Sequence, residues 1–414
     1  MEKISTNIAK VNSRGIGVVL DKNNNTLLEV PFSLPNEQVQ FTLDDEGQAK
    51  LIRLEPSSSD RSEPRCPQFT KCGGCSLQHA SESFVSNWKK SIVVDKLKRR
   101  NIYSNFLTSF VAPERSRRRA VFSGRRTKKG TIVGFHSPRS NNLVSIAGCI
   151  ILDFRILSFL PGMERITGLA CTRSSAIKIY VSNSENGLDV YVEGAKPLDL
   201  VLQESIASIA VEYQLARLSW DGELIASIKP PVQIMGNVKI IPPERFFMQA
   251  TKDSEMVMVQ DICESLEDET IVADLFSGCG TFTLPLAQTK KVMAFENSFQ
   301  MINALDNAYR DAPNLKIIET SIRNLRNNPL SSDELSGIGG VVVNPPRSGA
   351  ADQCKELAKS NVKKVLIVSC NPETFSRDAS ILITGGYNLD WVRIIDQFRW
   401  SHHIEVIGNF SKNF

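Results

Sequence analysis

Long apolar runs are absent from this chain of 414 residues. A transmembrane helix would need a stretch of about eighteen or more apolar residues, and none occurs. The first ten residues, MEKISTNIAK, also lack the basic-then-apolar pattern of a secretory signal. We therefore expect a cytoplasmic, monomeric protein with no membrane partner.

A strong excess of charge is also missing, and so is a regular set of paired cysteines. The net charge of +4 at pH 7 is too small to establish a polyanionic partner by itself. The 9 cysteines are odd in number and spread over a long chain. This argues against a closed disulfide framework and favours reduced thiols that bind a metal or take part in catalysis.

The length and the local patterns predict three folded units. Residues 1–56 alternate short apolar runs with turn signals, which predicts a small OB-like antiparallel barrel suited to RNA binding. A polar linker leads to a central α+β unit, residues 66–235. In residues 240–414, seven strand-like runs alternate with helical stretches, which predicts a doubly wound α/β sheet. The last two runs follow each other closely and permit an antiparallel hairpin at one sheet edge.

Basic residues are concentrated between Lys89 and Lys129. Their density over two predicted elements favours a surface that follows RNA phosphates. The alternative is a solvated helix face next to a charged hairpin. The residues concerned are Lys89, Lys90, Lys96, Lys98, Arg99, Arg100, Arg115, Arg117, Arg118, Arg119, Arg125, Arg126, Lys128 and Lys129.

A glycine-rich loop, DLFSGCG, joins a predicted strand to a helix in the C-terminal unit. Gly278 and Gly280 allow the backbone to approach a ligand closely. Glu296 ends the next strand about twenty residues on, where a carboxylate can bind both hydroxyls of a ribose. The pair indicates an adenosine-containing cofactor; the alternative is a tight turn with an unrelated glutamate. A dinucleotide is disfavoured because Phe282 replaces the third glycine of the fingerprint.

Two further motifs follow neighbouring predicted strands. Asn344 begins the sequence NPPR after one strand, and Cys370 lies in SCNP after the next. The carboxyl ends of parallel strands meet at one rim, so these residues should lie near the glycine loop. NPP also resembles amino-methylating enzymes, but those place an aromatic residue where Arg347 stands. Cys370 is a candidate nucleophile, and inert packing is the alternative.

Glu405 is a single acid in the last apolar run, HHIEVIGNF. Burial of a lone carboxylate is costly, so we interpret Glu405 as a partly buried base. A carboxylate of an edge strand facing water is the alternative. His402 and His403 could be alternative bases, metal ligands or ordinary strand residues.

Three cysteines form the pattern C-x5-C-x2-C, with two glycines between the last two. The glycines allow a turn that directs neighbouring thiolates at one metal, and a fourth cysteine lies further along the chain. Spacing alone does not separate a [4Fe–4S] cluster from tetrahedral zinc, and free thiols are a third interpretation. The candidate ligands are Cys66, Cys72, Cys75 and Cys149.

Together these motifs resemble the uracil-5 RNA methyltransferase family, the bacterial enzymes that make 5-methyluridine in 23S ribosomal RNA and in transfer RNA. The resemblance covers nearly the whole chain, through the cysteine pattern, DLFSGCGTFTLPLA, NPPRSG, VSCNPETFSRD and SHHIEV. It implies an N-terminal TRAM module, a central iron–sulfur domain and a class I Rossmann-like methyltransferase domain with a mixed seven-stranded sheet.

The resemblance also implies the reaction and its residues. S-adenosylmethionine-dependent methylation of uridine C5 would proceed through an adduct of Cys370 with C6, and Glu405 would be the general base. The implied [4Fe–4S] ligands are Cys66, Cys72, Cys75 and Cys149, and the implied cofactor-binding residues are Gln249, Phe276, Gly278, Gly280, Glu296 and Asn344. The expected partner is structured RNA with the target uridine splayed out, 23S ribosomal RNA first and transfer RNA second. A non-catalytic RNA-binding protein is the alternative from another class.

Three positions depart from the usual family pattern. Thr251 stands where asparagine is usual, Asn344 where many members have aspartate, and Arg399 where proline is usual. These departures bear on the positioning of substrate and cofactor, and leave the chemical core intact. Cytosine-5 methylation is disfavoured because the NPP region has no cysteine.

Overall fold

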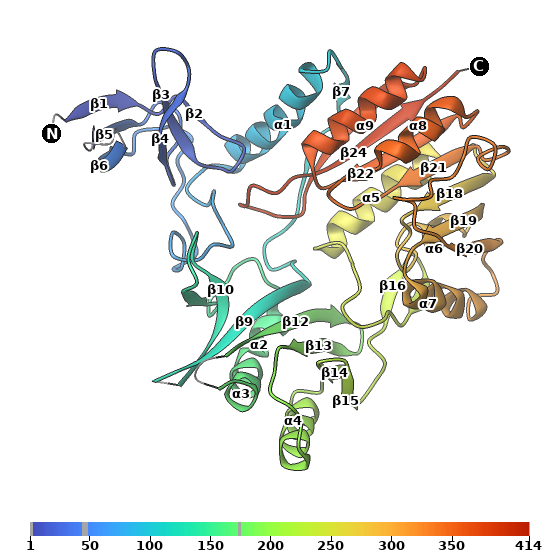
Figure 1. Ribbon diagram of the computed structural model, residues 1–414, viewed down its shortest axis with the longest axis horizontal. Coiled ribbons are helices and arrows are strands. Elements are labelled where there is room, and N and C mark those ends of the chain that lie inside the picture. Colours follow the sequence, from blue (N-terminus) through green and yellow to red (C-terminus); the bar gives the residue numbers. More distant parts are fainter. Residues whose placement is uncertain (1–2, 44–48, 129, 173–174, 414) are drawn as a thin grey trace.

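The computed structural model describes residues 3–43, 49–128, 130–172 and 175–413. Figure 1 shows a small N-terminal β unit, a central sheet with helices, and a larger C-terminal α/β unit. The expected mixed α/β architecture is therefore confirmed. No helix within the described ranges is long and apolar enough to cross a membrane.

The N-terminal unit consists of two antiparallel sheets that share one apolar core. Val30, Val39 and Phe41 are fully buried in that core. The expected antiparallel β unit is thus present, and its closure into a single OB-like barrel stays a prediction; Phe32 and Asn36 adopt positive φ in the turn between β4 and β5. One sheet contains β1 (Ile4–Asn7), β5 (Gln38–Leu43) and β6 (Ala49–Glu55), and the other contains β2 (Lys10–Val11), β3 (Gly17–Leu20) and β4 (Thr26–Val30).

The central unit is a seven-stranded sheet covered by helices, as expected for an α+β fold. Its strand order is β11-β10-β9-β12-β13-β14-β15. Phe122 and Ile179 of the sheet, Met163 of α3 and Ile206 of α4 are all fully buried in one core. The strands are β9 (Arg119–Thr127), β10 (Gly130–His136), β11 (Leu143–Ser145), β12 (Ala176–Ser184), β13 (Gly187–Glu193), β14 (Arg217–Trp220) and β15 (Glu223–Ser227), and the helices are α2 (Phe154–Ser158), α3 (Leu160–Ala170) and α4 (Leu200–Glu212).

The C-terminal unit is built on a larger sheet than expected. The seven expected strands are present, in the order β20-β19-β18-β21-β22-β24-β23, and β24 runs antiparallel to its two neighbours. The edge of β23 is extended by β7 (Asn105–Phe106) and β8 (Phe110–Val111), which makes nine strands. The addition covers a sheet edge that would otherwise be open. The seven are β18 (Ile271–Leu275), β19 (Lys291–Glu296), β20 (Ile318–Ile322), β21 (Gly340–Val343), β22 (Lys364–Ser369), β23 (Asn388–Asp396) and β24 (Glu405–Ser411).

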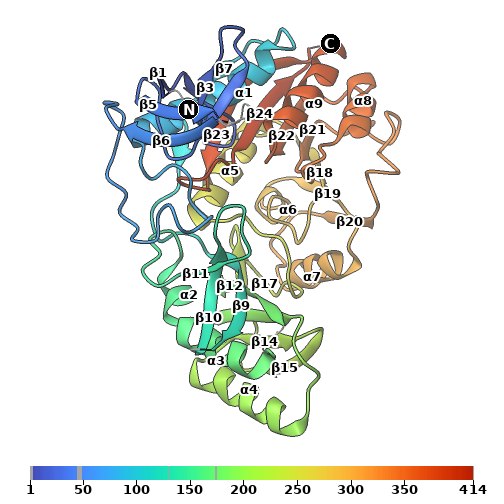
Figure 2. The same cartoon turned by 60° about the vertical axis from the view of Figure 1, so that its left-hand side comes forward.

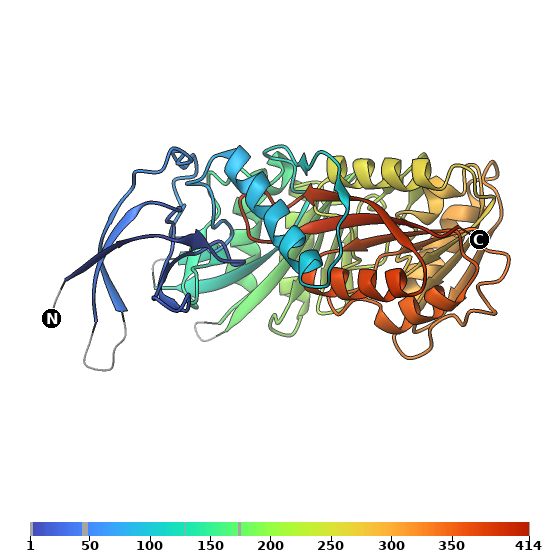
Figure 3. The ribbon, with the colours of Figure 1, turned by 90° about the horizontal axis from the view of Figure 1, so that it is seen from above.

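Helices cover both faces of this sheet, each over its own apolar core. Figure 3 shows the sheet nearly edge-on, with the yellow helix α5 on one side and the orange-red helices on the other. A short hairpin, β16 (Gln233–Met235) with β17 (Val238–Ile240), precedes α5. The helices are α5 (Lys252–Ser265), α6 (Thr283–Leu286) and α7 (Phe299–Arg310) on one face, and α1 (Glu82–Lys98), α8 (Ala351–Lys359) and α9 (Pro372–Thr384) on the other.

Helix α1 lies against the C-terminal sheet, although its sequence falls within the range expected for the central unit. Val93 and Leu97 of α1 are buried in the same core as α9. The other end of α1 packs through Trp88 on Leu34 and Leu77, which brings the N-terminal unit next to this helix (Figure 2). Helix α1 therefore connects the N-terminal unit to the C-terminal sheet.

Candidate active site

The glycine-rich loop between β18 and α6 depends on its unusual backbone conformation. Phe276, Gly278 and Gly280 all have positive φ, at 62°, 57° and 93°. A Cβ added at Gly280 would lie 2.6 Å from Leu305 Cδ1, so this glycine also permits close packing on α7. Positive φ at Phe276 is strained for a residue with a side chain, and such strain often accompanies a functional loop.

Glu296 is tied to the glycine loop at the carboxyl end of β19. The backbone N–H of Gly278 donates to Glu296 Oε2 at 3.1 Å, and those of Asn297 and Ser298 donate to Oε1 at 2.7 and 3.0 Å. Oε2 accepts one hydrogen bond and so keeps a second lone pair for a ligand hydroxyl, whereas Oε1 already accepts two. The expected neighbours Gly278 and Glu296 are thus brought together at one rim of the sheet.

Asp274 lies directly beneath this loop, and the sequence motifs assign it no separate role. Its carboxylate is completely buried, and Oδ2 accepts a hydrogen bond from Thr283 Oγ1 at 2.6 Å. Oδ1 has no hydrogen-bond partner among the described residues. Burial, opposed by the Thr283 hydrogen bond, raises the pKa of Asp274 to about 7. An acidic residue before the glycine loop was the signal that could have identified it.

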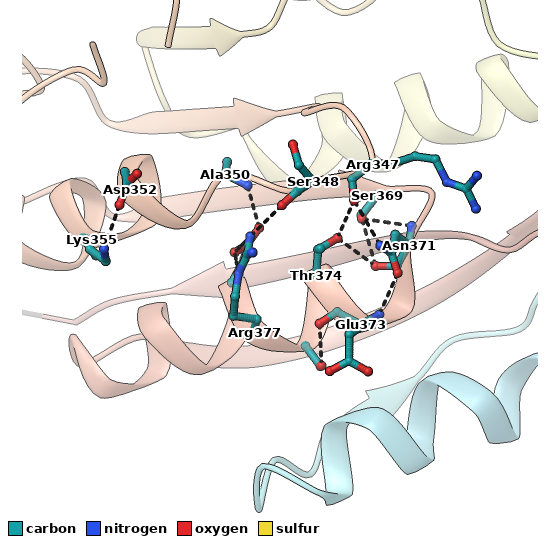
Figure 4. Close-up of polar contacts among 12 residues, drawn as sticks. Arg347, Ser348, Ala350, Asp352, Lys355, Ser369, Asn371, Glu373, Thr374 and Arg377 are labelled. Atoms are coloured by element: carbon teal, nitrogen blue, oxygen red, sulfur yellow. Dashed lines mark hydrogen bonds and ion pairs between the residues drawn. The ribbon is translucent and has the colours of Figure 1, made fainter. Parts of the chain in front are cut away.

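The NPPR and SCNP loops are joined to each other at the same rim. Asn371 Nδ2 donates to the carbonyl of Arg347 at 3.0 Å, and Asn371 Oδ1 accepts from Glu373 N at 3.1 Å, which caps α9 (Figure 4). Thr374 Oγ1 donates to the same Arg347 carbonyl at 3.3 Å. Asn344 N donates to Leu275 O at 3.2 Å, which places Asn344 beside the end of β18.

Cys370 and Glu405 lie next to each other. The antiparallel ladder of β22 and β24 pairs Ser369 with Val406, so Cys370 and Glu405 are the next residues beyond that pair. Cys370 is half-buried. Burial and then the charge of Glu405 raise the pKa of the Cys370 thiol, while the guanidinium of Arg347 lowers it.

Glu405 is buried, with 5% of its surface exposed, which overturns the alternative of an edge carboxylate facing water. Its Oε2 accepts a hydrogen bond from Gln397 Nε2 at 2.9 Å. The same Nε2 donates to Gln249 Oε1 at 2.8 Å, so Gln249 is linked to the carboxylate. Burial raises the pKa of Glu405 to about 7, although Gln397 and the charge of Arg119 oppose this shift. Gln397 was missed from the sequence, because a glutamine carries no motif signal of its own.

His402 and His403 precede β24 and are therefore not strand residues. Their ring centroids are 4.3 Å apart, and both residues line the cavity that Cys370 faces. Burial lowers the pKa of both imidazoles, in the case of His403 to about 4. Both rings are consequently neutral near neutral pH.

The candidate metal-ligating cysteines line one cavity of about 390 Å³, and the same cavity reaches Cys370. All of them are free thiols. Burial raises the pKa of the Cys75 thiol to about 12. Gly73 is required at the turn, since an added Cβ would lie 2.7 Å from the His136 carbonyl. Within the described ranges, no group of three or more His, Cys, Asp or Glu side chains is gathered closely enough to hold a metal ion. The four cysteines are Cys66, Cys72, Cys75 and Cys149.

The structure corrects the predicted phosphate-binding surface at two positions. Lys89 is completely buried, with Nζ 2.6 Å from Asp396 Oδ1, and Arg118 is buried in an ion pair with Glu255. Lys89 is on α1, which packs against the C-terminal sheet, and Arg118 lies just before β9 and pairs with Glu255 of α5, so both cations are taken up by contacts with the C-terminal unit. Lys129 lies outside the described residues. The residues of the stretch that remain exposed are Lys98, Arg99, Arg100, Arg115, Arg126 and Lys128.

Two of the three residues that depart from the usual family pattern, Thr251 and Arg399, have clear local roles. Thr251 is the N-cap of α5, where its hydroxyl accepts a hydrogen bond from Ser254 N at 3.2 Å. Threonine and asparagine are both good N-caps, so this departure keeps the cap. Arg399 Nη1 donates to Ala112 O at 3.1 Å, and its guanidinium pairs with Glu82. Arg399 thereby ties the loop before β24 to two distant segments.

Comparison with known proteins gives consistent matches. Residues 236–412 match the family model described as tRNA (Uracil-5-)-methyltransferase. An RNA methyltransferase from Brucella suis is 37% identical over 383 residues, 92% of each chain. A 23S rRNA (uracil(1939)-C(5))-methyltransferase from Shewanella woodyi is 27% identical over 99% of this chain and 96% of its own. A solved structure is also similar, the crystal structure of a Pyrococcus abyssi tRNA (uracil-54, C5)-methyltransferase with S-adenosyl-L-homocysteine. It is 21% identical, and the match covers 98% of this chain and 100% of that one. The TM-score of 0.72 shows that the two chains have the same fold.

Proposed function

This chain belongs to the family of S-adenosylmethionine-dependent RNA (uracil-5-)-methyltransferases, and we propose that Cys370 is its nucleophile and Glu405 its general base. The single observation that carries the proposal is the placement of these two residues at adjacent strand ends, in the register of Ser369 with Val406. A half-buried thiol beside a buried carboxylate provides the two groups that the reaction needs.

The reaction requires both groups in sequence, because C5 of uracil is a poor nucleophile. The Cys370 thiolate adds to C6, and the electron pair of the C5–C6 double bond moves toward O4. C5 would then take the methyl group that bound S-adenosylmethionine would supply, with the bond between that methyl and sulfur breaking. The Glu405 carboxylate takes the remaining proton from C5, the double bond re-forms, and the Cys370 thiolate leaves.

The glycine loop and its neighbours fit an adenosine-containing cofactor. We propose that Glu296 binds the ribose, that the loop from Phe276 to Gly280 accommodates the nucleoside, and that Asn344 and Gln249 line the methyl side. The fit rests on the positive φ of the loop and on the carboxylate held at its rim. When bound, S-adenosylmethionine supplies an electrophilic methyl group.

We propose that the four cavity thiols ligate a [4Fe–4S] cluster. Four free thiols line one cavity and supply the four donors that such a cluster needs, although the described side chains are not gathered at a single-metal site. When bound, the cluster would act as a structural tie between the segment 66–75 and Cys149, since methyl transfer consumes no external electrons. Protein purified without oxygen should be brown, with about four irons per chain. Stoichiometric zinc in place of iron would contradict the cluster.

We propose structured 23S ribosomal RNA as the substrate, with residues 1–56 acting as a TRAM-like RNA-binding unit. The support comes from the Shewanella woodyi relative, an rRNA enzyme that is similar over almost the whole chain. A transfer RNA is the second candidate, because the structure from Pyrococcus abyssi is that of a tRNA enzyme. Mass-spectrometric mapping of 5-methyluridine in RNA from a deletion strain tests the choice. Loss of the modification from tRNA alone would overturn the proposal for rRNA.

The covalent mechanism can be tested with RNA that contains 5-fluorouridine. Fluorine at C5 cannot leave as a proton, so the enzyme should be trapped as an adduct that migrates slowly on a denaturing gel. Cys370→Ala should form neither adduct nor product, with turnover reduced at least about a thousandfold, and should still bind S-adenosylhomocysteine. Wild-type turnover by Cys370→Ala would show that the assigned nucleophile is wrong.

A further inference from the structure

The side chain of Gln397 lies at the centre of the buried polar contacts around Glu405. Its Nε2 donates to Glu405 Oε2 at 2.9 Å and to Gln249 Oε1 at 2.8 Å. Its Oε1 accepts a hydrogen bond from the backbone N–H of Ala250 at 2.7 Å. Gln397 is 3% exposed and Gln249 is 1% exposed, so these groups are shielded from water. All polar atoms of this one amide are therefore engaged.

The orientation of this amide is fixed by chemistry. The backbone N–H of Ala250 can only donate, so the oxygen of the Gln397 amide must face it. The Nε2 group must then face the opposite way, toward Glu405 and Gln249. Glu405 consequently always meets a donor on this side, and that donor favours the ionised carboxylate.

We propose that Gln397 is a positioning residue for the reaction: its amide orients the Glu405 carboxylate, favours its ionised form and links it to Gln249. This inference rests on the proposed role of Glu405 as the base. Since the hydrogen bond from Gln397 engages Oε2, the other carboxylate oxygen is left to meet the C5 proton. Among the described residues, this is the hydrogen bond that reaches the Glu405 carboxylate.

A purely structural role for the Gln397 side chain is unnecessary, because its neighbours already anchor the backbone. Lys89 Nζ contacts Asp396 Oδ1 at 2.6 Å and donates to the Phe398 carbonyl at 3.2 Å. These contacts hold the residues on both sides of Gln397. The side chain is thus available for a role toward Glu405.

The other charged or titratable groups that face Glu405 come from different elements. Arg119, at the start of β9, favours the ionised carboxylate by its charge. Cys370 follows the end of β22, and its thiolate would disfavour the ionised form of Glu405. The same repulsion acts in the other direction, since the charge of Glu405 raises the pKa of the Cys370 thiol. If the Gln397 donor is removed, the charge of Arg119 is the remaining influence that opposes the rise of the Glu405 pKa caused by burial. Glu405 should then retain its proton to a higher pH.

The test compares Gln397→Met, which keeps the length and loses the donor, with the wild-type protein and with Glu405→Gln. In single-turnover reactions, Gln397→Met should accumulate the methylated RNA–protein adduct. The pH midpoint for release of this adduct should rise by about one unit, which makes release about fivefold slower near pH 7 and about tenfold slower well below it. Gln397→Glu, which is nearly isosteric, should shift the midpoint further in the same direction.

Gln353→Met provides a matched control. Gln353 is also a buried glutamine, but it bonds to the backbone of Leu330, away from the site. Its replacement should lower the melting temperature without moving the pH midpoint. S-adenosylhomocysteine binding and a thermal melt of both Gln397 variants establish that each is folded, and the nearly isosteric Gln397→Glu keeps the test available if Gln397→Met does not fold.

The outcomes separate this inference from the proposed function. A wild-type pH midpoint and no adduct in folded Gln397 variants, together with adduct in Glu405→Gln, would overturn the role of Gln397 and leave the base in place. Release of product by Glu405→Gln at the wild-type rate would instead overturn the proposed function. A raised midpoint in Gln397→Met and in Gln397→Glu, with Gln353→Met unchanged, supports the inference.

Discussion

Two buried carboxylates lie at neighbouring strand ends of one hairpin and have very different partners. Asp396 ends β23 and Glu405 begins β24, and Ile395 pairs with Glu405 across the ladder. Asp396 faces the ammonium group of Lys89 at 2.6 Å. Glu405 instead accepts a hydrogen bond from the neutral amide of Gln397 at 2.9 Å. The two acids therefore share a location and differ in the charge of the partner.

This difference in partner would distinguish a structural carboxylate, Asp396, from the proposed base, Glu405. Burial raises the pKa of Asp396, but the charge and hydrogen bond of Lys89 oppose that shift, so the acid remains in a fixed ion pair. Glu405 has no directly bonded cation among the described residues, and its pKa rises to about 7. A carboxyl group with a pKa near neutral pH can take up and release a proton during turnover.

The largest expected effect comes from Glu405→Gln. This change keeps the shape and removes the base, so methyl transfer can proceed while elimination stalls. Turnover should fall at least about a thousandfold, and a methylated adduct attached to Cys370 should accumulate. Denaturing gels with labelled RNA, followed by digestion, measure both quantities. Asp396→Asn is the matched control: its folded fraction should not accumulate adduct, and equal accumulation would abolish the distinction between the two acids.

The next largest effect concerns stability at the other acid. Asp396→Asn leaves the Lys89 ammonium buried without its counter-charge, which should cost about 3 kcal/mol in the free energy of unfolding. The double variant Lys89→Met with Asp396→Asn removes both charges and should recover much of that loss. Urea denaturation measures all three proteins. If the single and double variants were equally stable, the pair would not be the source of the loss.

The placement of the proposed reactive residues was predictable from the sequence, because its signals are local. The strand runs, the glycine loop and the cysteine after KVLIVS each form a short continuous pattern. The order of the parallel strands then brings their carboxyl ends to one rim, as the observed sheet confirms. Glu405 was identified because an acid in an apolar strand is unusual.

The contacts of Lys89, Asp396 and Gln397 were not predicted from the sequence, because these contacts join distant segments. Lys89 reads as one of many exposed cations, and its partner Asp396 lies 307 residues away. Gln397 meets Gln249 across 148 residues; the family resemblance pointed to Gln249, but no pattern in the sequence distinguishes Gln397 from a surface residue. The two short strands that extend the sheet, β7 and β8, are too brief to show a period of two.

A smaller effect should appear in the pH dependence of stability. Between its ordinary pKa of 4.5 and about 7, Glu405 is protonated in the folded protein and ionised in the unfolded chain. The folded state then binds more protons, so stability falls as pH rises through this window. From about pH 5 to about pH 8, the wild type should lose about 2 kcal/mol more than Glu405→Gln, which cannot ionise.

Comparing urea denaturation of these two proteins at both pH values isolates this contribution. Other buried acids, such as Asp274, are present in both proteins and cancel in the difference. Parallel pH profiles for the wild type and Glu405→Gln would mean that Glu405 is already ionised in the folded protein at the lower pH. Glu405 and Asp396 would then both be ionised in the folded protein, and a difference in protonation would no longer distinguish them.

The smallest expected effect extends the comparison to the basic residues. Lys89 is buried against Asp396, whereas Arg126 and Lys128 at the end of β9 are exposed. Exposed cations can neutralise RNA phosphates. Replacing both Arg126 and Lys128 by Ala should therefore reduce the slope of log affinity against log salt concentration, by about 1 for each phosphate that is no longer neutralised. Lys355→Ala is the control, because Lys355 is exposed on α8 in an ion pair with Asp352 (Figure 4). Filter binding at several salt concentrations gives the slope. The same slope in the wild type and in the double variant would show that this hairpin end is merely solvated and that RNA is bound by other surfaces of the protein.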